Sequence, residues 1–160
     1  FFKQKRVGRN GRYFYIHKLR SMYVDAEARK KELMAQNEMN GLMFKMEDDP
    51  RVTKVGKFIR RTSIDELPQL FNILRGDMSF VGFRPVCTSE KKLNALRRKM
   101  GVFEGRPGLT GYAQVLGRDS IGVARKARLY AEYQRKRSLR LDLWGIVKSV
   151  TVVLSGSGVM

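Results

Sequence analysis

The N-terminal residues 1–19 carry a pattern typical of a β-hairpin. Residues 12–16, Arg-Tyr-Phe-Tyr-Ile, are rich in strand-forming side chains, and Asn10-Gly11 stands directly before them. Asn-Gly favours a type I′ turn, because both central positions of that turn need a positive φ angle. We therefore predict a hairpin here. His17 lies on its second strand as a surface or packing residue, because no other histidine exists to share a metal ion with it.

Helical spacing of apolar residues dominates the rest of the chain. In residues 53–61 this spacing predicts a short helix that turns Val55, Phe58 and Ile59 inward. Further helices are expected over residues 25–38, 88–100, 120–137 and 139–154. Ser138 is expected to cap the last of these, and the glycine-rich residues 105–117 are expected to form a loop.

No repeat, linker or low-complexity tract divides the chain. We therefore expect a single domain over residues 1–160. Its predicted class is α+β, with short, partly amphipathic helices around the small N-terminal hairpin.

The segment RRTSIDELPQL, residues 60–70, places two adjacent carboxylates just behind two arginines. Ser63 stands three residues before Glu66, which is the spacing of a capping box, and Gly76 stands where a helix would end. Between them apolar residues recur at helical spacing, namely Leu67, Leu70, Phe71 and Leu74. We expect Asp65 and Glu66 in the first turn of an amphipathic helix, which is kinked at Pro68 or begins only there.

At a helix start, unpaired N–H groups and the helix dipole favour an ionised carboxylate. An ionised Asp65 can act as a nucleophile, and an ionised Glu66 can bind a hard cation such as Mg²⁺. Acids at this place more often serve only as helix caps, so from this stretch alone both interpretations stay open. The planar guanidinium of Arg60, just before the pair, suits phosphate oxygens.

The net charge of the chain limits the classes of molecule that it is expected to bind. Lysine and arginine number 33 against 15 aspartate and glutamate residues, for a formal net charge of +18. Such a charge implies nucleic acid, anionic lipid headgroups or phosphorylated substrates. No helix-turn-helix, zinc-finger or RNP-type pattern occurs, so we expect no nucleic acid. The single cysteine, Cys87, fits a reducing compartment, and no apolar run approaches the about 18 residues that span a bilayer.

Four stretches, in this order, resemble the bacterial sugar transferase family, the monotopic phosphoglycosyl transferases. They are FFKQKRVGRNGRYFYIHKLRSM, DPRVTKVGKFIRRTSIDELPQLFNILRGDMSFVGFRP, RPGLTGYAQVLGRDSI and RSLRLDL. The resemblance implies transfer of a sugar 1-phosphate from a UDP-sugar to polyprenyl (undecaprenyl) phosphate. It further implies release of UMP, a covalent aspartyl intermediate and Mg²⁺ as cofactor, in the first membrane step of polysaccharide or glycoconjugate biosynthesis.

The resemblance also implies roles for individual residues. Asp65 would be the nucleophile, Glu66 its catalytic and Mg²⁺-binding neighbour, and Asp142 a further ligand of the metal or the nucleotide. Phosphate binding is implied for a set of basic residues, Lys18, Arg20, Arg60, Arg84 and Arg118. One departure is Phe83, where the family usually has proline. This change affects the rigidity of the loop or the sugar pocket that the loop shapes.

The implied location is the cytoplasmic face of the bacterial inner membrane, an anionic surface on which helices 67–74 and 139–154 would lie. The last helix suits the protein core equally well. Members of the family carry a hydrophobic re-entrant segment just before the motif that begins this chain, so we expect a fragment that lacks this anchor. The sugar, the pathway and the oligomeric state, a homodimer included, stay open.

The alternative from another class is a non-enzymatic basic module that docks on anionic membrane or nucleic acid. Such a module explains the charge. It does not explain the acid pair or the order of the four motifs.

Overall fold

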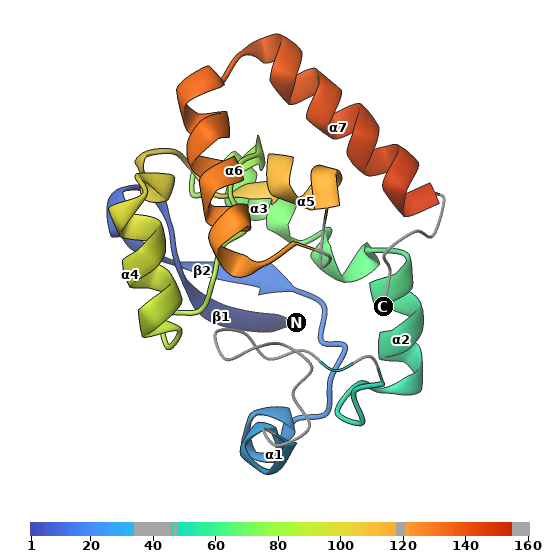
Figure 1. Cartoon of the computed structure of the whole chain (residues 1–160). Coiled ribbons are helices and arrows are strands. Elements are labelled where there is room, and N and C mark those ends of the chain that lie inside the picture. The colour runs from blue at the N-terminus through green and yellow to red at the C-terminus, as the bar shows by residue number, and fades with distance from the viewer. Residues whose placement is uncertain (34–45, 47, 118–120, 155–160) are drawn as a thin grey trace.

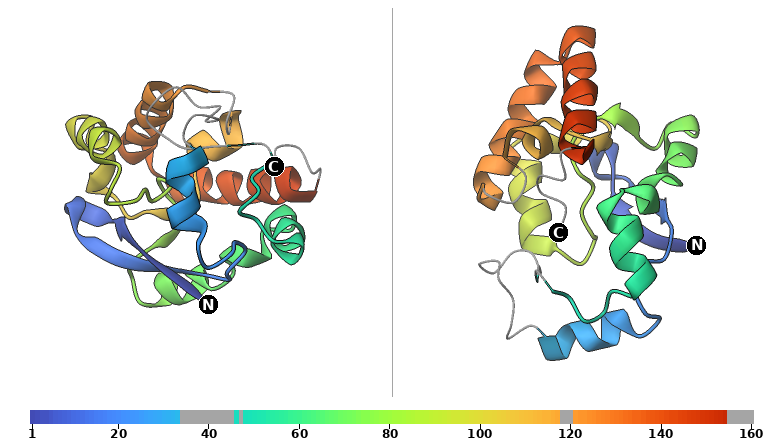
Figure 2. Two further views of the ribbon diagram at one scale, coloured as in Figure 1. Left: turned by 90° about the horizontal axis from the view of Figure 1, so that it is seen from below. Right: turned by 90° about the vertical axis from the view of Figure 1, so that its right-hand side faces the viewer.

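The computed structural model describes residues 1–33, 46, 48–117 and 121–154. In this part of the chain, helices surround two small two-stranded sheets, which confirms the predicted α+β class (Figure 1). The paired helices α6 and α7 lie at the opposite end of the molecule from α1 (Figure 2). No helix within the described ranges combines the length and the hydropathy needed to cross a bilayer.

The N-terminal hairpin forms as predicted. Strands β1 (Phe2–Val7) and β2 (Tyr13–Lys18) pair antiparallel. Asn10 and Gly11 have φ angles of 54° and 76°, and the Arg12 amide donates to the Arg9 carbonyl at 3.0 Å, which is the geometry of a type I′ turn. Phe14 and Ile16 are buried while Tyr13 and Tyr15 are exposed, so the side chains alternate as they should in a sheet covered on one face.

A second, parallel pair joins β3 (Ser79–Val81) to β4 (Gly108–Thr110). A Cβ atom at Gly108 would lie 2.1 Å from the Gly82 nitrogen, so glycine is required where the two backbones meet. The prediction of a loop over residues 105–117 is therefore wrong in part, because this range contains β4 and the helix α5 (Tyr112–Gly117). Gly108 and Gly111 serve close backbone packing against Gly82.

The main core lies between the hairpin and three C-terminal elements. These are η4 (Val102–Glu104), α5 and α6 (Val123–Lys136), and α4 (Lys91–Lys99) packs against η4 and α6. Phe83 is fully buried in this core and meets the Phe103 ring edge-on at 5.3 Å. The side chain that departs from the family pattern is thus a core residue.

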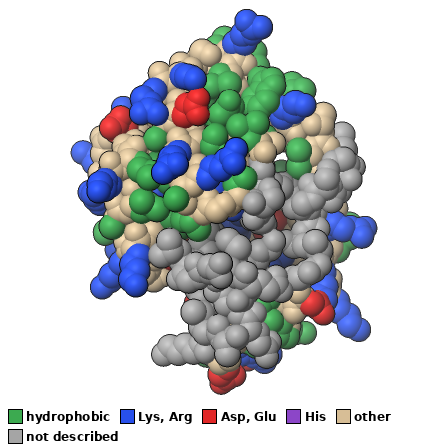
Figure 3. Space-filling view, viewed as in Figure 1, with side chains coloured by type: hydrophobic (Ala, Val, Ile, Leu, Met, Phe, Trp, Pro, Cys, Tyr) green, Lys and Arg blue, Asp and Glu red, His purple; other side chains and the backbone are tan. Residues whose placement is uncertain are grey.

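The final helix, α7 (Leu139–Leu154), has the predicted bounds, and the Ser138 hydroxyl accepts from the Leu141 amide at 3.3 Å, as expected of an N-cap. Hydrophobic side chains gather over α7 on the face shown in Figure 3. Two shorter helices differ from expectation. Helix α4 begins three residues later than Thr88, and α1 (Ala26–Glu32) covers only the start of the predicted 25–38, of which residues 34–38 lie outside the described ranges.

Helix α2 (Lys54–Arg61) confirms the short helix predicted over residues 53–61, and its N-cap Thr53 accepts from the Gly56 amide at 2.8 Å. The predicted inward face is wrong for two of its three residues, because Val55 is 71% and Phe58 57% exposed, whereas Ile59 is half-buried. The helix instead packs through Gly56, where a Cβ atom would lie 1.9 Å from the Ser21 carbonyl oxygen.

The acid pair lies in a separate 3₁₀ turn, η3 (Ile64–Glu66), and α3 (Gln69–Leu74) begins only after Pro68. The predicted capping box is wrong. Ser63 has a left-handed backbone, with φ 57°, and its side chain makes no cap hydrogen bond. Of the two expectations for Pro68, the helix that starts at this residue is the observed one, and Gly76 follows α3 with φ 81° as a C-terminal glycine should.

Helix α3 turns two polar residues and Ile73 inward and its other apolar residues outward. Gln69 and Asn72 are buried, and the Asn72 amide donates to the Tyr15 carbonyl at 2.8 Å and accepts from the His17 amide at 3.0 Å. His17 is thus a packing residue, as predicted. The apolar side chains of this region are exposed, namely Leu67, Leu70, Phe71 and Leu74.

Candidate active site

A cavity of about 780 Å³ lies between two walls that are distant in sequence. One wall is charged and is formed by the end of β2, α2, η3 and the segment after β3. The other wall is formed by α4 to α7 and includes apolar residues such as Leu109, Ile146 and Val150. Asp65 and Glu66 are part of the charged wall, so the acid pair singled out in the sequence faces a space that can hold a ligand.

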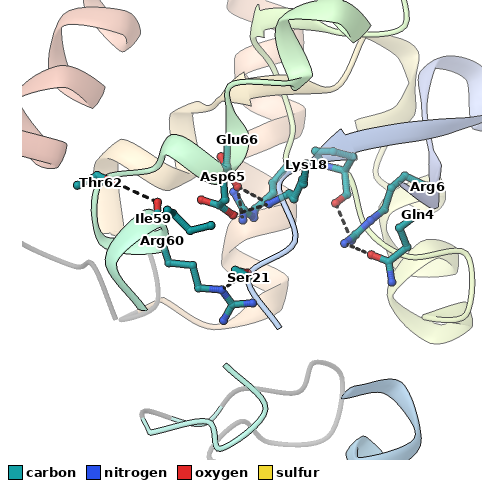
Figure 4. A network of polar contacts seen from close by, with 11 residues as sticks. Gln4, Arg6, Lys18, Ser21, Ile59, Arg60, Thr62, Asp65 and Glu66 are labelled. Carbon is teal, nitrogen blue, oxygen red and sulfur yellow. Dashed lines mark hydrogen bonds and ion pairs between the residues drawn. The ribbon is translucent and has the colours of Figure 1, made fainter. Parts of the chain in front are cut away.

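Hydrogen bonds between η3 and β2 position the acid pair beside Lys18. The Leu19 amide donates to the Asp65 carbonyl at 3.0 Å, which fixes the end of β2 against η3. The Lys18 Nζ atom then lies 2.6 Å from Glu66 Oε1 and 3.8 Å from Asp65 Oδ2 (Figure 4). Arg84 Nη2 lies 3.2 Å from the same Glu66 oxygen. Cations from two further segments therefore converge on carboxylates that η3 carries.

The two carboxyl groups titrate in opposite directions from their ordinary values. Burial raises the pKa of Asp65, and the charges of Lys18 and Arg60 offset this only in part. Burial opposes ionisation of Glu66 as well, but the charges and hydrogen bonds of Arg84 and Lys18 outweigh it and lower the pKa of Glu66 to about 2. The expected lowering of the Asp65 pKa by a helix start is not observed, because this residue lies in a buried 3₁₀ turn.

The predicted phosphate-binding residues divide into two groups. Lys18, Arg60 and Arg84 line the cavity, and Arg60 Nε donates to the Ser21 hydroxyl at 2.9 Å, which directs its guanidinium. Arg20 is not among the lining residues; it is exposed, and its guanidinium lies over the Phe2 ring at 5.4 Å. Arg118 lies outside the described residues.

Asp142 is not brought to the acid pair. It lies in the first turn of α7, where it accepts a hydrogen bond from the Tyr133 hydroxyl at 2.5 Å and pairs with Arg137 Nε at 3.8 Å. Burial and this hydrogen bond raise the pKa of Tyr133. Asp142 does not line the cavity of the acid pair, so the predicted pairing of Glu66 and Asp142 on one metal ion finds no geometric support.

A metal ion at this site would find its protein donor atoms in the carboxylate oxygens of Asp65 and Glu66. No cluster of three or more histidine, cysteine, aspartate or glutamate residues suited to a metal occurs in the described part of the chain. Mg²⁺ commonly takes one or two carboxylates and completes its six ligands with water and substrate phosphates. Two carboxylate groups at a cavity wall fit this coordination preference of Mg²⁺.

Sequence reasoning missed several cavity residues. Arg6, Glu90, Arg97, Gln114, Lys126 and Tyr130 also line the cavity. For Arg97 a signal exists, because it stands four residues after Leu93 and both belong to the buried face of α4. The others lie on elements whose approach to η3 follows from the tertiary fold alone.

Comparison with known proteins gives a consistent result. The family model described as "Bacterial sugar transferase" matches residues 1–156. Over 159 residues the chain is 50% identical to the galactosyl transferase CpsE of Streptococcus agalactiae serotype III, covering 98% of this chain and 35% of that protein. It is 38% identical to the undecaprenyl-phosphate galactose phosphotransferase of Salmonella typhimurium, covering 98% and 34%.

A third relative is the undecaprenyl-phosphate glucose phosphotransferase of Komagataeibacter xylinus, 39% identical over 89% of this chain and 27% of that protein. The chain thus spans about a third of the length of the relatives first named, at 35% and 34%. A match over almost the entire chain, with the order of motifs unbroken, assigns the family. The chain belongs to the bacterial sugar transferase family.

Proposed function

We propose that this chain transfers a sugar 1-phosphate from a UDP-sugar to undecaprenyl phosphate, a polyprenyl phosphate, and releases UMP. Two of the relatives are named undecaprenyl-phosphate sugar phosphotransferases, which supports this reaction class. The observation that carries the proposal is the buried Asp65 carboxylate on a cavity wall, with Lys18, Arg60 and Arg84 around it. Such an arrangement suits a nucleophile that attacks an anionic phosphate.

In the first step an Asp65 carboxylate oxygen attacks the β-phosphorus of the UDP-sugar. A bond forms between this oxygen and phosphorus, and the bond from phosphorus to the oxygen that bridges the two phosphates breaks. UMP leaves with that electron pair, and the sugar phosphate stays on Asp65 as an acyl phosphate. In the second step a phosphate oxygen of the lipid attacks the same phosphorus, and the Asp65 carboxylate is released.

The basic residues of the cavity supply charge stabilisation in both steps. Lys18, Arg60 and Arg84 lie where phosphoryl oxygens and the departing UMP would carry negative charge. The raised pKa of Asp65 matches a carboxylate that is more nucleophilic than an ordinary one. Since the pKa of Glu66 is about 2, this residue keeps its charge and is available as a cation ligand throughout the working pH range.

Bound Mg²⁺, held by Glu66 with Asp65 beside it, would neutralise charge on the diphosphate. In the structure Lys18 and Arg84 contact Glu66 directly, at 2.6 and 3.2 Å. A diphosphate would therefore compete with Glu66 for these two cations and release its oxygens for the metal. Mn²⁺ binding, followed by its electron paramagnetic resonance signal, should accordingly tighten when UDP is present.

We further propose that the chain works at the cytoplasmic face of the bacterial inner membrane, and two properties of its surface support contact with a membrane. The exposed apolar side chains of α2 and α3 lie beside the cavity wall that carries the acids. With a net charge of +18, the chain suits an anionic headgroup layer. The apolar wall of the cavity would accept the first isoprene units while the charged wall holds the phosphate.

The decisive experiment omits the lipid acceptor. The covalent route predicts that UDP-sugar alone releases up to one UMP per enzyme and leaves a sugar-phosphate mass adduct on Asp65. A full-length, membrane-inserted enzyme that turns over with acceptor, yet shows neither burst nor adduct without it, would support direct one-step transfer instead. If a panel of UDP-sugars yields no UMP at all, the alternative of a non-enzymatic basic module gains.

A further inference from the structure

Two arginines hold the backbone of the segment that carries Arg84. Arg97 Nη1, from α4, donates to the Arg84 carbonyl at 2.6 Å. Arg6 Nη1, from β1, donates to the next carbonyl, that of Pro85, at 3.2 Å. Both arginines line the cavity of the acid pair. The hairpin and α4 thus grip successive carbonyls of one short segment.

The segment itself is not part of a regular element. Residues 84–86 lie between two isolated bridges, Phe83 to Pro107 and Cys87 to Arg6. The Val7 amide adds one hydrogen bond to the Val86 carbonyl at 3.2 Å. A stretch without its own helix or ladder depends on neighbouring side chains for a defined position, so the two guanidinium groups have a clear mechanical task.

Arg97 occupies a costly position for a cation. Arg97 is only 3% exposed, and its guanidinium lies over the Tyr130 ring, 5.2 Å from the ring centroid. Among the described residues no carboxylate lies within ion-pair distance of it, although the charge of Glu90 acts on it from further away, and its Nε atom is buried without a hydrogen-bond partner. Burial of an incompletely paired charge opposes folding, and an apolar side chain at this place on α4 would avoid that cost.

The hydrogen bond from the Arg97 guanidinium to the Arg84 carbonyl is the interaction that offsets this cost. From this backbone the Arg84 side chain extends to Glu66 at 3.2 Å, so a shift of the segment would move the guanidinium relative to the acid pair. Phosphate-binding groups act best when their own support is rigid, since displacement of about 1 Å can cost a large part of the rate.

We propose that Arg97, assisted by Arg6, is a positioning residue that holds the Arg84 guanidinium in place for the phosphate of the substrate. This role rests on the proposed function for its kinetic consequence. Its structural part, the fixing of residues 82–87, stands independently of any reaction.

The test is a double-mutant cycle on the full-length protein. Arg97→Met alone should lower kcat/KM for UMP release by about tenfold or more, through a higher KM for the UDP-sugar. In an Arg84→Ala background the same substitution should have almost no further effect, because Arg97 acts through Arg84. Arg98→Met, the exposed neighbour on α4, removes the same charge and should leave kcat/KM within about twofold.

A second measurement does not need turnover. Hydrogen–deuterium exchange of the amides in residues 82–87 should become at least about tenfold faster in Arg97→Met and in Arg6→Gln, but not in Arg98→Met. Arg97→Lys, which keeps the charge but loses the planar donor fork, should show the same change if Arg97→Met fails to fold. Equal kinetic losses with and without Arg84, or unchanged exchange, would overturn the positioning role. If exchange is faster in Arg97→Met but the wild-type protein itself releases no UMP, the positioning role stays intact and the proposed function is refuted.

Discussion

Two aspartates of this chain are equally buried and yet titrate in opposite directions. The side chains of Asp49 and Asp65 are each 10% exposed. Burial raises the pKa of both, but hydrogen bonds from Arg51 reverse this at Asp49 and hold its pKa below the ordinary value. At Asp65 burial prevails, and the pKa is raised. Exposure alone therefore does not decide how a carboxyl group behaves; direct donors to its oxygens do.

The geometry of the two sites explains the difference. Arg51 donates to both Asp49 oxygens, from Nε at 2.8 Å and Nη2 at 2.6 Å, and its backbone amide adds a third bond at 3.0 Å. At Asp65, by contrast, Lys18 Nζ lies 3.8 Å from Oδ2 and bonds to Glu66 instead. Both Asp49 oxygens accept hydrogen bonds from Arg51, so this carboxylate stabilises the fold. The Asp65 carboxylate instead lines a cavity.

The largest expected effects come from variants that neutralise each aspartate in turn and so test whether the two carboxylates have different roles. Asp65→Asn should lower UMP release by more than about 10³-fold and abolish the mass adduct, because the amide is a poor nucleophile. Its melting temperature should not fall, since a buried charge is removed. Asp49→Asn should retain a stoichiometric adduct per folded molecule. An adduct that persists in Asp65→Asn would show that another residue is the nucleophile.

The next largest effects are expected when the cations around the acid pair are replaced. Arg84→Ala and Arg60→Ala should each lower turnover by about 10²-fold, because each removes charge stabilisation from the phosphate. Both side chains lie at the cavity surface, so the free energy of unfolding should change by no more than about 0.5 kcal/mol. Arg60→Lys should not restore the full rate, because a point charge lacks the guanidinium fork.

Arg20→Ala is the matched control for these variants, because Arg20 carries the same charge but lies outside the cavity lining. It should retain turnover within about twofold. Steady-state UMP release together with thermal unfolding checks the whole series. Loss of turnover in Arg20→Ala equal to that in Arg84→Ala would indicate that general charge, and not position, matters.

Asp49 should in turn govern stability. Asp49→Asn leaves Arg51 buried without its carboxylate and should cost about 3 kcal/mol in the free energy of unfolding at pH 7. Because the folded pKa lies below the ordinary value of about 3.9, the stabilisation is fully present above that pH and is lost as the pH falls through the folded pKa. The gap in melting temperature between wild type and variant should be constant from neutral pH down to about pH 5 and should shrink below about pH 4. A gap that already closes near neutral pH would contradict this assignment.

The smallest expected effect concerns a property that neither aspartate controls. Expressed by itself, this chain should bind anionic vesicles, and binding should weaken with salt because each lysine or arginine near the surface contributes about 1 kcal/mol. Asp49→Asn and Asp65→Asn should leave this binding unchanged. Phe71→Ser should reduce it several-fold, whereas Tyr15→Ser on the hairpin should not. Co-sedimentation across salt concentrations measures all four, and absence of binding at low salt would contradict the expected membrane contact.

Local sequence signals proved reliable where one segment decides its own conformation. The Asn10-Gly11 turn, the Ser138 cap and the bounds of α7 all follow from short-range preferences, and all three are confirmed. Ser63 shows the limit. Its spacing to Glu66 is that of a capping box, but Pro68 delays α3 and the chain turns through a left-handed Ser63 instead.

Amphipathic pattern told which residues share a face but not which way that face turns. On α2 and α3 most apolar side chains point outward, because Gly56 allows close contact with the Ser21 backbone and Asn72 bonds to the edge of β2. Both contacts join residues far apart in the chain. A pattern of spacing contains no information about such partners.

By itself the sequence determined the hairpin, most of the helices and the presence of the acid pair, since each depends on residue types at short, fixed spacings. The resemblance of four stretches to a known family indicated the family and three of the cations around the acid pair. Only the tertiary structure decided that Asp65 is buried with a raised pKa, that Arg20 and Asp142 point elsewhere, and that Arg97 supports Arg84. The physical reason is that desolvation and charge–charge interaction depend on distance through space, which distant segments set together when they pack.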